Sequence, residues 1–303
     1  MYDVIIIGSG PAGYTAGIYA SRARRKTILF SGLLPGGQLV GTTIVENYPG
    51  FEKGILGPEL MDVMRKQTER SEAEIVDDRI VKVDFKTKPF KVFTKNKEYQ
   101  GKAVIIATGA DYRKLEIKGE KEYSGRGVSY CAVCDGPLFK NEILAVVGGG
   151  DAAMEESIFL SQYAKEVHVI HRRDKLKASK IMQEKAFKIK KIKFHWNTEV
   201  KEIKGDAKVQ EIIVINNKTN KKEIMKVGGI FIAIGHIPNT ELFKGQIKLD
   251  KKGYIALKNK TETSVKGVFA AGDVHDYNYR QAVTAAGFGC MAALDADRYL
   301  GDE

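Results

Sequence analysis

Short apolar runs that end at glycine recur along the chain and predict buried parallel strands followed by turns. The first run covers residues 2–7, and after a helical stretch at about 14–24 a second run follows at 27–30. Strand, glycine turn, helix and strand thus occupy about thirty residues, the size of a dinucleotide-binding βαβ unit. The same order recurs from 143–147, through a helical stretch that ends near Tyr163, to 167–170. The duplication indicates two nucleotide-binding folds.

The glycines of both turns stand at the spacing that a bound pyrophosphate requires. The first turn reads Gly8-Ser-Gly10-Pro-Ala-Gly13, and the second reads Gly148-Gly-Gly150-Asp-Ala-Ala153. The first glycine permits the tight turn, the second lets the backbone approach the phosphates, and a small third residue lets helix and strand pack closely. The N–H groups at the start of the helix then hold the phosphates. A tight turn without a ligand is the alternative, and two copies make it the weaker interpretation.

Other segments complete the sheets. Three further apolar runs predict buried strands that end at glycine turns: 104–109, 229–235 and 267–273. A long helical pattern covers about 281–299. Alternating, β-branched stretches at 75–100 and 194–226 predict small antiparallel sheets. Glycine- and proline-rich stretches at 32–41 and 48–58 predict loops.

The last strand and helix do not form a third βαβ unit, so they are expected to complete the first domain. We therefore predict an α/β fold with two Rossmann-like dinucleotide-binding domains, the second inserted in the first. Each domain is expected to carry a small antiparallel β excursion. The predicted division is 1–112 and 241–303 for the first domain, and 113–240 for the second.

Composition excludes several classes of protein. With 303 residues, 43% hydrophobic and 29% charged, the chain can bury a core without disulfide or metal staples. Its longest apolar runs, such as 4–7 and 230–234, are far shorter than the ~20 residues of a membrane helix. We find no secretory signal and expect a cytoplasmic protein with no membrane association. The net charge of +11 is spread over short lysine clusters, which indicates a solvated surface and no nucleic-acid partner.

The residues after the second strand of each βαβ unit suggest what each site holds. An acidic residue there commonly binds the adenosine ribose. The first unit has Ser31-Gly32 instead, whereas the second has His171-Arg172-Arg173. Arginine pairs bidentately with phosphate and is how such folds accept the 2′-phosphate of NADP. We expect NADPH at the second site, unless these are two surface arginines, and a different dinucleotide, a flavin, at the first.

Two of the three cysteines form the motif Cys131-Ala-Val-Cys134, followed by Asp135. Two cysteines at this spacing can close a disulfide across a turn, and in a chain without an export signal they favour redox chemistry. A neighbouring carboxylate can donate and accept the proton of a thiol. Half of a zinc site and an inert pair are the alternatives. Cys290 is isolated and the histidines lack paired spacing, so we predict no metal site.

With these features, the sequence closely resembles the low-molecular-weight thioredoxin reductases of bacteria and archaea over essentially the whole chain. The segments that resemble the family's FAD contacts are 8–14, 36–38, 46–50, 272–273 and 279–282. Residues 131–136 resemble its redox centre, and 171–173 its NADPH 2′-phosphate site. The resemblance implies FAD and NADPH as cofactors, thioredoxin or a similar small redoxin as partner, a homodimer, and an NADPH domain that rotates against the FAD domain.

The resemblance also implies roles for individual residues. Cys134 would face the flavin, Cys131 would attack the disulfide of the partner, and Asp135 would be the general acid. The positions expected at FAD are Gly8, Gly10, Pro11, Ala12, Gly13, Ser31, Gly32, Gly37, Gln38, Asn47, Asp273, Arg280, Gln281 and Ala282. The positions expected at NADPH are Gly148, Gly150, Asp151, Ala153, His171, Arg172, Arg173 and Lys177.

Two positions depart from the family pattern. Lys177 stands where the family often has a third arginine, and Ala152 where it commonly has a hydroxyl residue. Lysine keeps the charge but loses the bidentate fork, so the 2′-phosphate is expected to be held less firmly. The predicted function is a FAD-dependent NADPH:thioredoxin disulfide reductase. A related flavin NAD(P)H reductase with another redoxin acceptor or donor is the enzymatic alternative, and a nucleotide-binding redox sensor without turnover is the non-enzymatic one.

Overall fold

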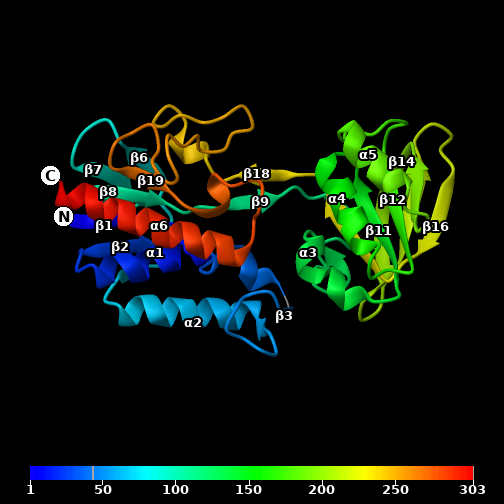
Figure 1. The fold of residues 1–303 in the computed structure, drawn as a ribbon, viewed down its shortest axis with the longest axis horizontal. Helices are drawn as coiled ribbons and strands as arrows, with labels where there is room; N and C mark the ends of the chain where they lie inside the picture. Colours follow the sequence, from blue (N-terminus) through cyan, green and yellow to red (C-terminus); the bar gives the residue numbers. More distant parts are fainter. Residues whose placement is uncertain (43, 303) are drawn as a thin grey trace. The chain divides into compact units, whose positions relative to one another are not determined.

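The computed structural model describes residues 1–42 and 44–302. The chain forms two compact units: Met1–Asp111 with Ile237–Glu303, and Tyr112–His236 (Figure 1). The second unit is therefore inserted in the first, and each contains a parallel sheet with helices and a short antiparallel excursion. The fold class predicted from the sequence is confirmed.

The first unit is built on a seven-stranded sheet in the order β5-β2-β1-β8-β7-β6, with β19 also paired to β8. The parallel strands are β1 (Tyr2–Ile7), β2 (Thr27–Phe30), β5 (Glu74–Val76), β8 (Glu98–Ile106) and β19 (Val268–Ala270). The antiparallel excursion consists of β6 (Lys82–Asp84) and β7 (Phe90–Phe93). This part of the chain confirms the antiparallel strands predicted between 75 and 100.

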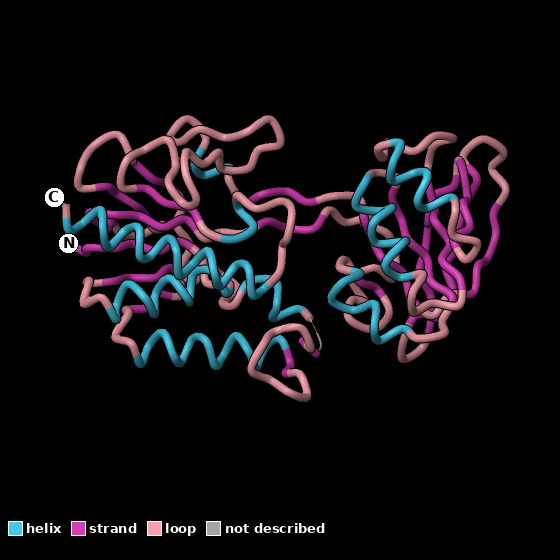
Figure 2. The backbone as a smooth tube through the Cα atoms, viewed as in Figure 1, coloured by secondary structure: helices cyan, strands magenta, loops and turns pink. Residues whose placement is uncertain are grey.

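Three helices cover one face of this sheet: α1 (Pro11–Arg22), α2 (Gly57–Arg70) and α6 (Ala282–Gly301) (Figures 1 and 2). Successive side chains of a strand point to opposite faces. Val4 and Ile6 of β1 accordingly pack with the helices, whereas Ile5 and Ile7 pack in a second core with Phe90. Residues 4–7 of β1 are apolar without interruption because both faces of the strand are buried there.

The loop prediction for 32–41 and 48–58 is partly wrong. A short 3₁₀ helix occupies Gly37–Gly41, and β4 (Ile55–Leu56) pairs with β3 (Ile44–Val45). Helix α2 then begins at Gly57, with Pro58 in its first turn. Proline in the first turn of a helix lacks only an N–H that has no helical partner there, so it starts α2 instead of breaking it.

The second unit has a five-stranded parallel sheet in the order β10-β17-β11-β12-β13. These strands are β10 (Val128–Ser129), β11 (Ile143–Gly148), β12 (Glu166–His171), β13 (Ile192–Trp196) and β17 (Gly229–Ala233). The helices are α3 (Ala132–Asp135), α4 (Asp151–Leu160) and α5 (Lys180–Phe187). An antiparallel sheet of β14 (Thr198–Gly205), β15 (Val209–Asn216) and β16 (Lys222–Lys226) confirms the second predicted excursion.

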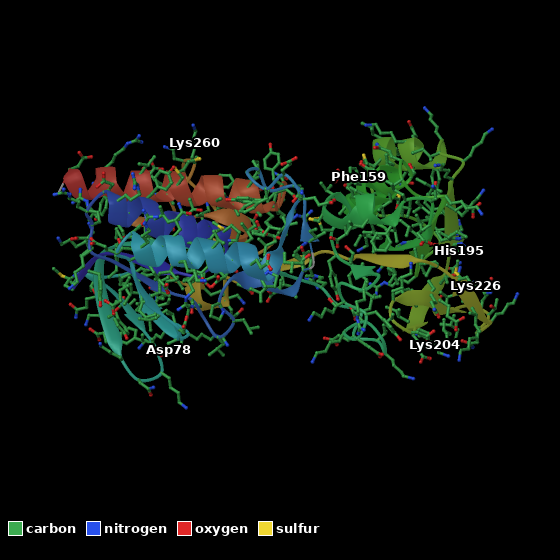
Figure 3. All side chains as sticks on the ribbon, turned by 90° about the horizontal axis from the view of Figure 1, so that it is seen from below. Asp78, Phe159, His195, Lys204, Lys226 and Lys260 are labelled. Atoms are coloured by element: carbon green, nitrogen blue, oxygen red, sulfur yellow. A yellow bond between two sulfur atoms is a disulfide. The ribbon has the colours of Figure 1, made fainter. Side chains whose placement is uncertain are left out.

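The faces of the second sheet also alternate. Val146 of β11 packs with α4 and α5, whereas Val147 packs with the antiparallel strands. Lys204 and Lys226 extend from those strands into solvent (Figure 3), as expected for a solvated basic surface. The remaining short strands, β9 (Ala110–Tyr112) and β18 (His236–Pro238), pair where the chain passes between the units. Within residues 1–42 and 44–302, no helix has the length and apolar character to cross a bilayer.

Candidate active site

The first glycine turn joins β1 to α1, and each of its glycines has a separate physical reason. A Cβ on Gly8 would lie 2.2 Å from the carbonyl oxygen of Ala107, and one on Gly13 would lie 1.9 Å from that of Gly8. Close packing of helix and strand therefore requires glycine at both positions. A Cβ on Gly10, at the N-cap of α1, would meet nothing within 4 Å. The turn thus leaves open space beside a helix N-terminus, which is where a pyrophosphate fits.

The segment after β2 is attached to this turn by hydrogen bonds. The Ser9 hydroxyl donates to the carbonyl oxygen of Ser31 at 2.8 Å and accepts from the Gly36 N–H at 3.0 Å. Gly37 has a φ of +65°, and a Cβ there would lie 3.4 Å from the Cα of Gly10. The structure therefore brings the expected residues of 31–37 beside the glycine turn.

The C-terminal segment also lies beside the first residues of α1. A Cβ on Gly272 would lie 3.0 Å from the Cβ of Ala12 in α1. The next residue after this contact is Asp273. Burial raises the pKa of Asp273 to about 7, the nearby Asp276 carboxylate adds to the rise, and Arg280 opposes it. The carboxyl of Asp273 can therefore hold a proton near neutral pH.

Two further expected residues, Asn47 and Gln281, are brought together at the start of α6. The Asn47 amide donates to the Gln281 side chain at 3.3 Å. Gln281 and Thr284 form a capping box there, so the position of Gln281 is fixed by the helix that it begins. Nearby, His275 Nε2 and Asp276 Oδ2 are buried with no hydrogen-bond partner among the described residues. Such orphaned polar atoms are expected where a polar ligand completes the packing.

The second glycine turn joins β11 to α4 in the same way. A Cβ on Gly148 would lie 2.4 Å from the carbonyl oxygen of Ala233, whereas a Cβ on Gly150 would meet nothing within 4 Å. Ala153 is fully buried, which meets the need for a small third residue. Asp151 begins α4 and accepts the Ser179 N–H at 2.7 Å; this hydrogen bond lowers the pKa of its carboxyl.

His171, expected at NADPH, lies beneath the second turn. The residue is only 8% exposed, and its Nε2 donates to the Lys175 carbonyl at 2.9 Å. A Cβ on Gly149 would lie 2.2 Å from this ring, and the Gly149 carbonyl accepts the N–H of Lys177 at 2.7 Å. His171 thus supports the turn and the loop after β12. That loop carries the exposed cations Arg172, Arg173, Lys175 and Lys177.

The two cysteines of the motif form a disulfide, Cys131–Cys134, at the start of α3. The Cys134 N–H points at Cys131 Sγ, 3.2 Å away. Asp135 follows, and the Ser129 hydroxyl donates to its Oδ2 at 2.6 Å while accepting the Cys131 N–H at 3.1 Å. Burial raises the pKa of Asp135, against the opposing effect of the Ser129 hydrogen bond. The motif therefore combines a disulfide with a carboxyl group that keeps its proton to a higher pH than an ordinary aspartate does.

Comparison with known proteins matches these features to one family. Residues 2–289 match the family model for pyridine nucleotide-disulphide oxidoreductases. A thioredoxin reductase of Streptomyces coelicolor is 54% identical, with 98% of this chain and 94% of that protein aligned. The chain belongs to the thioredoxin reductases. The family expected from the sequence is confirmed.

Solved thioredoxin reductases agree in structure. The enzyme from Giardia duodenalis aligns with a TM-score of 0.95 and 45% identity over 99% of both chains. The enzyme from Streptococcus pyogenes gives a TM-score of 0.96 and 43% identity over 100% of this chain and 99% of that one. Thioredoxin reductases of this family contain FAD and depend on NADPH, so the two cofactors expected from the sequence are those of the family.

Sequence reasoning missed Ser129 and the support behind the cysteines. Tyr130 stacks on Tyr112 with ring centroids 4.9 Å apart, and its hydroxyl donates to Glu120 at 3.0 Å. Glu120 also accepts the N–H groups of Leu115 and of the next residue, at 3.0 and 2.6 Å. No spacing rule links a glutamate to a tyrosine ten positions later, so only the folded chain identifies this support. Among the residues described, no group of three or more His, Cys, Asp or Glu side chains could hold a metal ion.

Proposed function

We propose that the chain is a thioredoxin-disulfide reductase that passes electrons from NADPH, through FAD and the Cys131–Cys134 pair, to thioredoxin or a similar small redoxin. The observation that carries the proposal is the Cys131–Cys134 disulfide beside the protonatable Asp135, in a unit inserted between the two parts of another nucleotide-binding unit. Bound FAD and NADPH would supply the hydride chemistry, which protein side chains cannot.

We propose the first unit as the FAD site. Its open N-cap position at Gly10 offers backbone N–H groups to the pyrophosphate, and the orphaned atoms of His275 and Asp276 are consistent with a polar ligand nearby. Asp273, with its pKa near 7, would hold a proton that it can share with a ribityl hydroxyl. Asn47 and Gln281, linked to each other, would close the site at the start of α6.

We propose the second unit as the NADPH site. Gly150 is open in the same way as Gly10, and the exposed Arg172 and Arg173 follow β12 where a 2′-phosphate would lie. Lys177 adds a further positive charge to this loop, without a bidentate fork. His171 acts on this site through packing, because its ring supports the turn from below.

The dithiol step follows from the chemistry of the motif. The reduced Cys131 thiolate attacks one sulfur of the redoxin disulfide, a mixed disulfide forms, and the other redoxin sulfur leaves as a thiolate. The Cys134 thiolate then attacks Cys131 Sγ, which closes Cys131–Cys134 and releases the second redoxin sulfur. Asp135 supplies a proton to a departing thiolate, and its raised pKa suits that role. Two electrons thus pass to the redoxin, and its second thiolate takes its proton from water.

We also propose a homodimer in the cytoplasm, where NADPH is available. Val283 and Leu294 of α6 are 43% and 41% exposed, and Tyr19 of α1 is 43% exposed. These apolar side chains on neighbouring helices would gain from burial against a second copy. Light scattering of the purified protein tests this: a mass near 33.6 kDa, that of one chain, would contradict the dimer.

An anaerobic titration with NADPH and, separately, NADH tests the donor. We expect near-stoichiometric NADPH to bleach the visible flavin absorbance, and NADH to do so only in large excess, because Arg172 and Arg173 favour the 2′-phosphate. Lys177 and Ala152 favour the alternative of a changed donor. Bleaching by NADH alone would establish a changed donor and leave the dithiol proposal standing. A purified protein without flavin would remove both the donor proposal and the dithiol proposal.

A further inference from the structure

The first nucleotide unit lacks a carboxylate at the position where such folds commonly bind the adenosine ribose. Ser31 occupies that position, directly after β2. In the sheet, β2 pairs in parallel with β5, and Phe30 is opposite Val76. Ser31 and Asp77 therefore leave neighbouring strands at the same edge. The register thus places a carboxylate from the next strand beside the position that lacks one.

The side chains make this placement specific. The Ser31 hydroxyl donates to Oδ1 of Asp77 at 2.7 Å. Arg65 of α2 donates from its two terminal nitrogens to Oδ1 and Oδ2 of Asp77, at 2.8 and 2.9 Å. Ser9 of the glycine turn donates in turn to the Ser31 carbonyl at 2.8 Å. A chain of hydrogen bonds thus links Asp77 to the turn proposed to hold the pyrophosphate.

Asp77 is fixed and still accessible. Its side chain is 52% exposed, whereas that of Arg65 is 26% exposed. The hydrogen bonds from Arg65 and Ser31 lower the pKa of Asp77, so the carboxylate stays charged. A carboxylate has about four acceptor positions, and three hydrogen bonds to Asp77 occur among residues 1–42 and 44–302. One position on Oδ2 therefore remains for a ligand hydroxyl.

We propose that Asp77 supplies the carboxylate that binds the adenosine ribose of FAD, in place of the acid that β2 lacks, with Arg65 as its positioning residue. The inference rests on the proposal that the first unit holds FAD. A hydroxyl that donates to a charged carboxylate binds more strongly than one that donates to a neutral group. An ion pair that served only the stability of the fold would be indifferent to the ribose hydroxyls.

Competition between two flavins distinguishes these roles. The holoenzyme is exchanged to equilibrium with an equal mixture of FAD and its 2′-deoxyadenosine analogue, and the flavins retained are quantified after separation. We expect the wild-type protein to retain FAD over the analogue by about tenfold or more, the size of one hydrogen bond to a charged group. Asp77→Ala should bring this ratio close to one.

Asp78→Ala is the matched control. Asp78 is the next residue, is labelled in Figure 3, and its carboxylate accepts the N–H of Arg79 within its own loop. The Asp78→Ala protein should prefer FAD over the 2′-deoxyadenosine analogue as strongly as the wild type does. Equal retention of the two flavins by the wild type, or an unchanged preference in Asp77→Ala, would overturn the proposal. If Asp77→Ala does not fold, Asp77→Ser replaces it, and the wild-type ratio alone still decides whether the hydroxyl is recognised. A wild-type protein that retains neither flavin would instead remove the proposed function.

Discussion

Gly149→Ala is expected to destabilise the second unit, because its methyl group would collide with the ring of His171. An ideal Cβ on Gly149 lies 2.2 Å from Cε1 and 2.3 Å from Nδ1 of that ring. The ring cannot easily move, since it is buried and hydrogen bonded to the Lys175 carbonyl at 2.9 Å. Overpacking of this kind costs about 1–3 kcal/mol, which is the expected loss in the free energy of unfolding.

A double-mutant cycle tests this cause. In the His171→Ala background the ring is absent, so Gly149→Ala should cost little, or stabilise by up to about 1 kcal/mol through a less flexible unfolded chain. Urea unfolding can be followed by the fluorescence of Trp196, the only tryptophan, whose ring lies 6.3 Å from that of His171. Gly150→Ala, with nothing within 4 Å of its Cβ, is the control and should change stability by less than about 1 kcal/mol. An equal cost of Gly149→Ala in both backgrounds would refute the packing role of His171.

Three more predictions follow from the site. Burial raises the pKa of Asp273 to about 7, so the folded chain binds a proton that the unfolded chain has lost; stability should fall as the pH rises from about 4 to 7. Asp273→Asn should remove that fall, which is worth at most about 3 kcal/mol between pH 5 and pH 8, when FAD-free protein is unfolded in urea at these two pH values. Replacing Arg172 and Arg173 by alanine should weaken NADPH binding by about 10- to 100-fold and leave NADH binding unchanged in equilibrium titrations. Gly13→Ala places its Cβ 1.9 Å from the Gly8 carbonyl oxygen and should lower the unfolding free energy of the FAD-free protein by about 3 kcal/mol.

The strands and turns of both sheets are predictable from the sequence because their signals are local. Residues 4–7 and 143–147 are apolar without interruption, since strands of a covered parallel sheet are buried on both faces. Helix α2 escaped prediction because Gly57-Pro58 has the composition of a loop. Only the way that the chain continues through Leu60 and Met64 to the core identifies the proline as a helix start.

The chemistry of the site is likewise predictable only where its residues are close together in the sequence. Cys131, Cys134 and Asp135 are adjacent in the sequence, so a spacing rule can find them. The contact of Ser31 with Asp77 depends instead on the register between β2 and β5, across 46 positions of sequence. Such pairs are fixed by strand pairing and side-chain length, which the spacing of residues does not record.

Electron transfer through the disulfide is tested most directly by comparing Cys131→Ser and Cys134→Ser with the wild type. Each variant is titrated anaerobically with NADPH and then assayed for reduction of thioredoxin by the appearance of free thiols. We expect the flavin of both variants to be bleached by NADPH, and thioredoxin reduction to be lost in both, because disulfide exchange needs both sulfurs. Continued reduction of thioredoxin by Cys131→Ser would contradict the assignment of Cys131 as the thiol that attacks the partner.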